Sequence, residues 1–180
     1  MTPAEVGSNE KTSEEAVSRI AVLARELHEA MSDVVWSINP VNASIESFIQ
    51  RSRKYLNEVC EARGISISFE SDEKVLKTQA PPELLHNLLL IIKEAITNIV
   101  RHAGCSQARV RIRDSDGNIY LDVWDNGCGF DNGSRMTGNG LRNMSRRAEQ
   151  LGGTMAVQSA KTNGTTLSFS IPKKKNRTFV

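Results

Sequence analysis

The chain has 180 residues, which suffice for one well-packed domain and a smaller accessory segment. Its 23 basic and 21 acidic residues give a net charge of +2, so no overall field favours nucleic acid or an anionic membrane as a partner. No apolar run reaches the roughly 18 residues of a membrane span, and the N-terminus lacks the apolar stretch of a signal peptide. Cys60, Cys105 and Cys128 are widely spaced and form no CxxC pair, which excludes the usual zinc patterns. We therefore expect a cytoplasmic protein with reduced thiols and no membrane span in this chain.

Residues 1–12 are polar without periodicity and residues 173–180 form a basic tail, so we expect both ends to be disordered. From residue 13 to 38, apolar side chains recur at steps of three and four, which predicts an amphipathic helix. Asn39-Pro40 ends this helix, and helical spacing resumes from Ile45 to Gly64. Residues 13–64 are thus predicted to form an antiparallel two-helix hairpin. Its apolar face needs a partner, and a second copy of the hairpin would give a homodimer.

After Gly64 the apolar period changes to two, and ISISFE predicts a half-buried strand. A long apolar helix follows Pro81-Pro82 and extends to about His102. The later segments ARVRIR, NIYLDVWD, TMAVQSA and TTLSFSIP predict strands, and LRNMSRRAEQLGG predicts a helix between the second and third of them. This order predicts an α+β fold for residues 65–172. We expect a two-layer α/β sandwich rather than a parallel doubly wound sheet.

Three local patterns in residues 65–172 suggest a binding site. Glu94 and Asn98 are four residues apart and share one face of an otherwise apolar helix, although a solvated helix edge would explain them alone. Asp125 ends a strand beside two glycines, where the backbone must approach another group closely, although a turn would also fit. Residues 138–141, GNGL, begin a helix, where free N–H groups favour a phosphate.

Taken together, these segments resemble the nucleotide-binding boxes shared by sensor histidine kinases, Hsp90 chaperones, type II topoisomerases and MutL. KEAITNIVRHA resembles the N box, DNGCGF the first glycine box, GNGLRNMSRRAEQLGG the second, and Gly164-Thr165-Thr166 the closing G-T motif. The resemblance covers roughly residues 65–172. The sequence of GLRNMSRRAEQLGG resembles the sensor-kinase branch related to nitrate and degradative-enzyme regulators more than it resembles the chaperones. It implies a Bergerat-type sandwich that binds ATP between the sheet and a mobile lid.

The resemblance also implies a role for each matched residue. Glu94 would polarise the attacking group or orient a water, Asn98 would hold Mg²⁺, and Asp125 would accept a hydrogen bond from the adenine amino group. The other ATP-binding residues that it implies are Arg101 at the phosphates, His102 at the ribose, Gly127 and Gly129 against the purine, Gly138, Gly140 and Leu141 at the lid, and Thr165 in support of Asp125.

ARELHE in the first predicted helix resembles the phosphoacceptor box of the same kinase branch. The resemblance implies that His28 accepts the phosphoryl group and that Glu29 takes its proton during attack. The segment that follows, MSDVVWSINP, resembles kinases that often lack this histidine. The alternative is therefore that His28 is a solvent-exposed side chain that accepts no phosphoryl group.

The favoured function is therefore a homodimeric histidine kinase core. It would bind Mg-ATP and transfer the γ-phosphoryl group to a histidine, from which a response regulator would take it. Two alternatives remain at this point. One is a serine/threonine kinase of the anti-sigma type on the same fold, and the other is a nucleotide-gated binding module without transferase activity.

Overall fold

The computed structural model describes residues 20, 31, 44–130 and 139–173. The chain divides into two units, Met1–Asn39 and Pro40–Val180. In the first unit only Ile20 and Met31 are described, and their side chains are 65% and 66% exposed. The rest of the first predicted helix, including His28, lies outside the described residues. No described helix is both long and apolar enough to cross a membrane.

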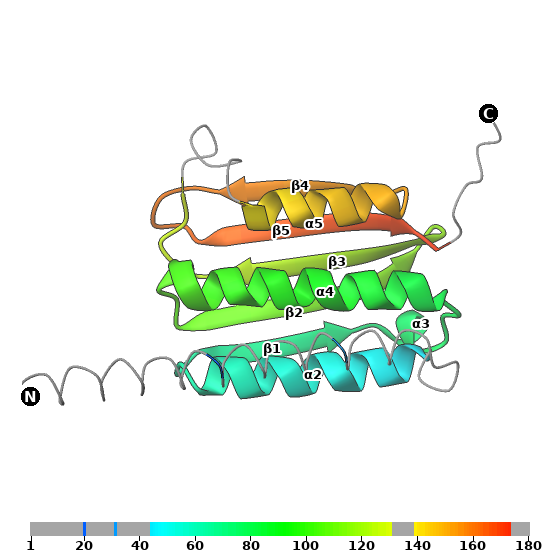
Figure 1. Ribbon diagram of the computed structural model, residues 1–180, viewed down its shortest axis with the longest axis horizontal. Coiled ribbons are helices and arrows are strands. Elements are labelled where there is room, and N and C mark those ends of the chain that lie inside the picture. Colours follow the sequence, from blue (N-terminus) through cyan, green and yellow to red (C-terminus); the bar gives the residue numbers. More distant parts are fainter. Residues whose placement is uncertain (1–19, 21–30, 32–43, 131–138, 174–180) are drawn as a thin grey trace, which may run out of the picture. The chain divides into compact units, whose positions relative to one another are not determined.

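The second unit is built on a five-stranded sheet with the order β1-β2-β3-β5-β4 (Figure 1). The strands are β1 (Ser66–Ser71), β2 (Gln107–Ser115), β3 (Asn118–Asp125), β4 (Thr154–Ser159) and β5 (Thr165–Pro172). β1 pairs with β2 in parallel, and the other neighbours are antiparallel. The parallel pair requires a crossover, which the short helix α3 (Glu73–Leu76) and the long helix α4 (Pro82–Asn98) provide. The predicted α+β sandwich is confirmed.

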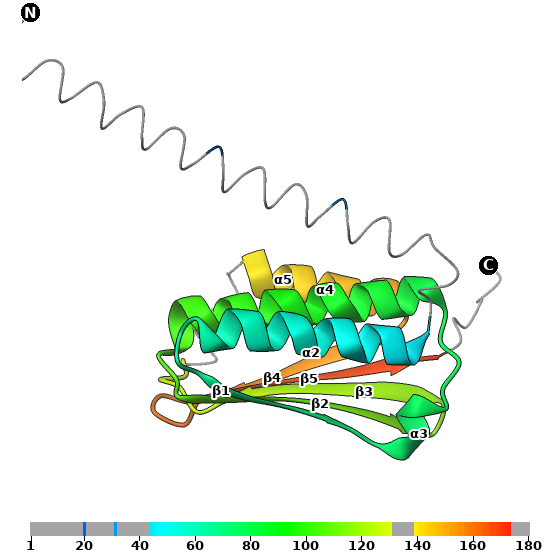
Figure 2. The same ribbon diagram turned by 90° about the horizontal axis from the view of Figure 1, so that it is seen from below.

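Three helices form the second layer and lie over one face of this sheet (Figure 2). They are α2 (Ile45–Glu61), α4 and α5 (Asn139–Gln150). α4 lies in the middle, and its apolar residues are buried on most of its circumference. In β2 and β3 every second residue is buried, so one face of each strand meets the helices. The core therefore lies between α4 and the central strands. The candidate site described below lies at one end of this core.

Helix α2 differs from the expectation that it belongs to a separate hairpin ending at residue 64. Ser44 caps it by accepting a hydrogen bond from Ser47 N, and its apolar face is buried against α4 and β1. Phe48 and Leu56 are 0% and 1% exposed within the second unit. The structure thus places the start of this unit at Pro40 rather than after Gly64. The expectation differed because an amphipathic pattern predicts which face of a helix is buried, but it does not predict which part of the protein covers that face.

The other face of the sheet is polar and carries cations stacked on aromatic rings. The guanidinium of Arg109 lies 5.3 Å from the ring centre of Trp124, and that of Arg113 lies 5.6 Å from the ring centre of Tyr120. These side chains keep the apolar rings covered while the charges stay in water. A mostly antiparallel sheet with one solvent-exposed face therefore needs no second helical layer.

Candidate functional site

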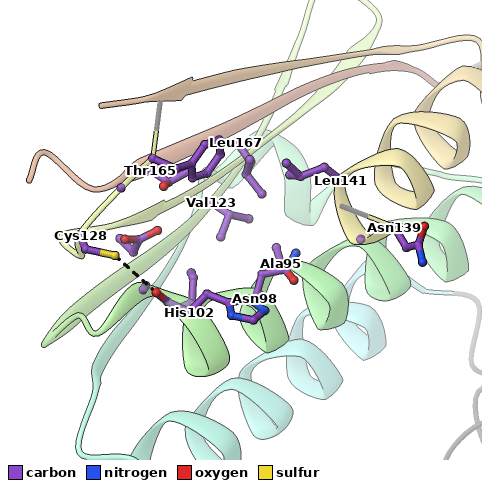
Figure 3. Close-up of a pocket in the computed structure, with 15 residues that line it drawn as sticks. Ala95, Asn98, His102, Val123, Cys128, Asn139, Leu141, Thr165 and Leu167 are labelled. Atoms are coloured by element: carbon purple, nitrogen blue, oxygen red, sulfur yellow. Dashed lines mark hydrogen bonds between the residues drawn. The ribbon is translucent and has the colours of Figure 1, made fainter. Parts of the chain in front are cut away.

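A cavity of about 420 Å³ opens between α4, the ends of strands β3 and β5, and the start of α5. Figure 3 shows its labelled side chains: Asn98 and His102 come from α4 and its continuation, Thr165 from β5, and Leu141 from α5. The sequence-predicted residues that line it are Asn98, His102, Asp125, Gly129, Gly140, Leu141 and Thr165. The fold therefore brings together residues from all four predicted boxes.

Asp125 supplies the buried charge of the cavity. It is the last residue of β3, lies directly opposite Thr165 in the sheet, and is only 4% exposed. Its Oδ1 atom accepts a hydrogen bond from Gly127 N at 2.8 Å. Burial raises the pKa of this carboxyl, while the backbone N–H groups of Gly127 and Thr165 act in the opposite direction. A carboxylate kept dry in this way is costly for folding, which is typical of a functional group.

Glycines beside Asp125 allow chain segments to pack closely. A Cβ atom on Gly127 would lie 2.3 Å from Ala103 O, and one on Gly164 would lie 2.0 Å from Asp125 O. Gly164 also has a φ of +69°, which a residue with a side chain rarely adopts. The lack of a side chain at Gly127 thus serves contact with the end of the long helix, whereas Gly129 lines the cavity itself.

The long helix reaches this loop through a wider turn. α4 continues as a π-helical turn, η2 (Ile99–Ala103), and ends at Gly104 in the left-handed conformation. Cys128 N donates a hydrogen bond to Ala103 O at 2.8 Å, and Cys128 Sγ lies 3.4 Å from His102 O. Such π turns often occur at functional sites. Arg101, in the same turn, is exposed and is not among the residues that line the cavity.

At the opposite end of the cavity, α5 lies close to the polar face of α4. A Cβ atom on Gly140 would lie 2.4 Å from Glu94 Oε1 and 3.1 Å from Asn98 Nδ2. The first turn of α5 therefore leaves room for the side chains of Glu94 and Asn98, both half-buried. Gly138, the other predicted lid glycine, lies outside the described residues.

The comparisons with known proteins agree with this arrangement. The family described as histidine kinase-, DNA gyrase B- and HSP90-like ATPases matches residues 85–175. The chain belongs to this family. The matched range includes most of the long helix, both glycine boxes and the closing G-T motif, so it contains every described residue that lines the cavity.

Individual relatives come from sensor histidine kinases. The chain is 27% identical to sensor histidine kinase YxjM of Bacillus subtilis over 165 residues, which are 92% of this chain and 39% of YxjM. A blue-light activated histidine kinase of Erythrobacter litoralis superposes with a TM-score of 0.68 at 22% identity, over 90% of this chain and 52% of that one. Full-length ShkA in complex with AMPPNP superposes with a TM-score of 0.61 at 19% identity, over 73% of this chain and 30% of ShkA. The chain thus spans less than half the length of YxjM.

Sequence reasoning missed the apolar wall of the ATPase-family cavity. Ala95, Ile99, Val123, Phe130 and Leu167 line it together with the polar groups. Phe130 lies in the loop after β3, and the other four residues have the spacing of ordinary core positions in the sequence. Only the place of these four at the open end of the core distinguishes them. An apolar wall next to a buried carboxylate suits a purine, which combines an apolar face with a polar edge.

Asn126 is a second residue that the motif reading did not single out. Its Oδ1 atom accepts hydrogen bonds from Ser106 N at 3.0 Å and Gln107 N at 2.9 Å. Its Nδ2 atom donates to Ser106 Oγ at 3.1 Å. Asn126 therefore ties the loop after β3 to the start of β2 and holds Asp125 in place.

The described residues contain no cluster of three His, Cys, Asp or Glu side chains that could hold a metal ion by themselves. A divalent cation would need additional ligands from a bound phosphate chain. Asn98 and Glu94 provide oxygen donors of the kind that Mg²⁺ prefers, and Gly140 places no side chain against them. These residues fit a Mg-nucleotide better than a free metal ion.

Proposed function

We propose that the chain is the ATP-binding catalytic core of a sensor histidine kinase, which transfers the γ-phosphoryl group of Mg-ATP to a histidine. The observation that carries this proposal is the polarity of the cavity. The buried carboxylate of Asp125 lies at one end, and Asn98 and Gly140 line the other, where the Glu94 carboxylate lies against Gly140. The similarity to ShkA, whose structure contains AMPPNP, supports an adenine nucleotide as the ligand.

The Asp125 end is suited to the adenine base. An ionised carboxylate only accepts hydrogen bonds, so it selects a donor such as the exocyclic amino group. Its hydrogen bond to Gly127 N fixes the carboxylate before the ligand arrives. Val123 and Leu167 lie on the same sheet face and offer apolar contact to the ring. Recognition of the base therefore offsets the cost of burying Asp125.

The α5 end is suited to the phosphates and the reacting group. Mg²⁺, when bound, neutralises phosphate charge, and Asn98 is the residue that would hold it. Glu94 lies one helical turn before Asn98, where it would orient the attacking group. The first N–H groups of α5 have no partners within the helix, and they lie at the positive end of the helix dipole. Both features favour binding of the negatively charged phosphates. Positioning and charge neutralisation supply most of the catalysis in phosphoryl transfer.

His28 is the acceptor that we propose, with Glu29 as the group that takes its proton. The support is the ARELHE segment and the similarity to sensor histidine kinases over 92% of the chain, which includes this region. By the same similarity, we propose a homodimer formed through the N-terminal helix and a response regulator as the recipient of the phosphoryl group. We accordingly propose that this activity takes place in the cytoplasm, where Mg-ATP and response regulators are available.

The test is incubation of the chain with γ-labelled ATP, followed by acid and base treatment. A phosphohistidine gives an acid-labile, base-stable label that should be absent in His28→Gln, while nucleotide binding persists. A label of equal size in His28→Gln would reject His28 as the acceptor. An acid-stable label would instead indicate a serine or threonine, and nucleotide binding without any label would indicate a gated binding module.

A further inference from the structure

Ser159 connects three parts of the candidate site, although no sequence motif led to it. It is the last residue of β4 and lies opposite Thr165 of β5. Its Oγ atom accepts a hydrogen bond from Phe130 N at 2.9 Å and lies 3.0 Å from Thr165 Oγ1. The same oxygen lies 3.1 Å from Gly164 O, to which it donates. Phe130 and Thr165 both line the cavity.

The number of protons determines the direction of these hydrogen bonds. A serine hydroxyl has one proton to donate and two lone pairs that can accept. A carbonyl oxygen can only accept a hydrogen bond, and a backbone N–H can only donate one. The proton of Ser159 goes to Gly164 O, because that carbonyl cannot donate. Its lone pairs then receive Phe130 N–H and the hydroxyl proton of Thr165. This is the arrangement that satisfies all three contacts.

The consequence concerns the side of Thr165 that faces the cavity. Once Thr165 donates its proton to Ser159, its oxygen has only lone pairs left for a ligand. Asp125, directly opposite Thr165 in the sheet, is likewise an acceptor. The base edge therefore meets two acceptors side by side. A purine with an amino group at C6 provides donors for them, whereas a purine with a carbonyl at C6 presents a third acceptor and is repelled.

We propose that Ser159 is a positioning residue that holds the Thr165 hydroxyl as a hydrogen-bond acceptor, so that Thr165 and Asp125 together select adenine over 6-oxopurines. This inference rests on the proposed ATP-binding function and adds the determinant of base selectivity. Ser159 itself does not contact the nucleotide. Its effect passes through the orientation of one hydroxyl group and through the anchoring of Phe130 N.

The experiment measures the dissociation constants of ATP and of ITP, whose base carries a carbonyl at C6, for five forms of the full chain. These are the parent, Ser159→Ala, Ser159→Thr, Thr165→Val and the double variant Ser159→Ala/Thr165→Val. The preference for ATP over ITP should fall at least fivefold in Ser159→Ala and in Thr165→Val, mainly through weaker ATP binding. Ser159→Thr keeps the hydroxyl and should keep the preference. The double variant Ser159→Ala/Thr165→Val should lose no more than Thr165→Val alone, because both changes act on the same hydrogen bond.

An unchanged preference in Ser159→Ala would overturn the inference, and so would equal weakening of ATP and ITP, since that is the result of a merely structural role. If Ser159→Ala does not fold, the outcome for Thr165→Val is used instead. The proposal requires the preference for ATP over ITP to be lower in Thr165→Val than in the parent. Failure of the proposed function has a different signature: the parent chain itself would bind neither ATP nor ITP.

Discussion

Gly140 at the start of α5 lies against Glu94 on α4, so that a Cβ atom at Gly140 would stand 2.4 Å from Glu94 Oε1. This distance is shorter than any ordinary contact, and the Glu94 carboxylate would have to move. The glycine therefore keeps the two proposed phosphate-end residues, Glu94 and Asn98, in their positions. Their geometry depends on a residue of a different element.

Gly140→Ala should preserve the fold and reduce phosphorylation. Alanine favours a helix over glycine by about 1 kcal/mol, which offsets much of the cost of displacing a flexible carboxylate. The displaced Glu94 and Asn98 should lower the phosphorylation rate at least tenfold. The rate with labelled ATP and the thermal unfolding midpoint check this. Asn143→Ala, at an exposed position of the same helix, is the control and should keep both values. Full activity in Gly140→Ala would contradict the packing argument.

Asp125→Asn should weaken ATP binding at least tenfold, which is about 1.4 kcal/mol. The amide keeps an oxygen for Gly127 N but loses the charge and presents a donor to the adenine amino group. Isothermal titration gives the affinity directly. Asp122→Asn is the control, because Asp122 lies on the same strand and on the wet face of the sheet. Unchanged affinity in a folded Asp125→Asn protein would reject the adenine role.

The same substitution should also change how stability depends on pH. Burial raises the pKa of Asp125, so the folded state keeps its proton over a pH range in which the unfolded chain has lost it. The free energy of unfolding of the parent therefore falls as pH rises through this range. Asp125→Asn removes this effect and should be more stable than the parent at pH 7, with the difference vanishing below the ordinary carboxyl pKa. Denaturant unfolding at both pH values measures it, and an equal difference at both would contradict the burial argument.

Asn98→Ala should separate folding from metal-dependent binding. Asn98 is half-buried at the polar side of α4, whose stability comes from fully buried residues such as Leu88, Ile92 and Ile96. The variant should unfold near the parent's midpoint, but Mg²⁺ should no longer strengthen its binding of ATP. Titrations with and without Mg²⁺ measure this effect. Asn87→Ala, at the other end of the same helix, should retain the metal dependence, and retention in Asn98→Ala would remove the metal role.

Ser52→Ala should stabilise the protein by about 1–2 kcal/mol. Ser52 is 0% exposed on α2, and among the described residues its Oγ atom has no hydrogen-bond partner. Removing the hydroxyl eliminates this cost and adds the better helix propensity of alanine. Asn57→Ala, at an exposed position of the same helix, controls for propensity and should gain only about 0.5 kcal/mol. A gain at Ser52 no larger than at Asn57 would mean that the buried hydroxyl costs nothing.

The elements around the site could be predicted because their signals are local. Asp125 ends an alternating run, and the glycines beside it indicate close approach of the backbone whatever the neighbour is. Likewise, the four-residue spacing of Glu94 and Asn98 places both on one helix face without any tertiary information. The boxes formed by these residues pointed to the ATPase family, which the match over residues 85–175 shows.

Relationships between distant segments could not be predicted in this way. The apolar stripe of α2 predicted that one face of this helix is buried, but only the tertiary structure shows that α4 and β1 cover it. Ser159 has the sequence context of any strand end, and its contacts with Phe130 and Thr165 exist because a hairpin and a loop 29 residues earlier meet at one point. Periodicity and glycine thus determine which surfaces must be buried or approached. Which groups meet there depends on packing and on hydrogen bonds between residues far apart in the chain, and these arise only when the whole sheet and its helices assemble.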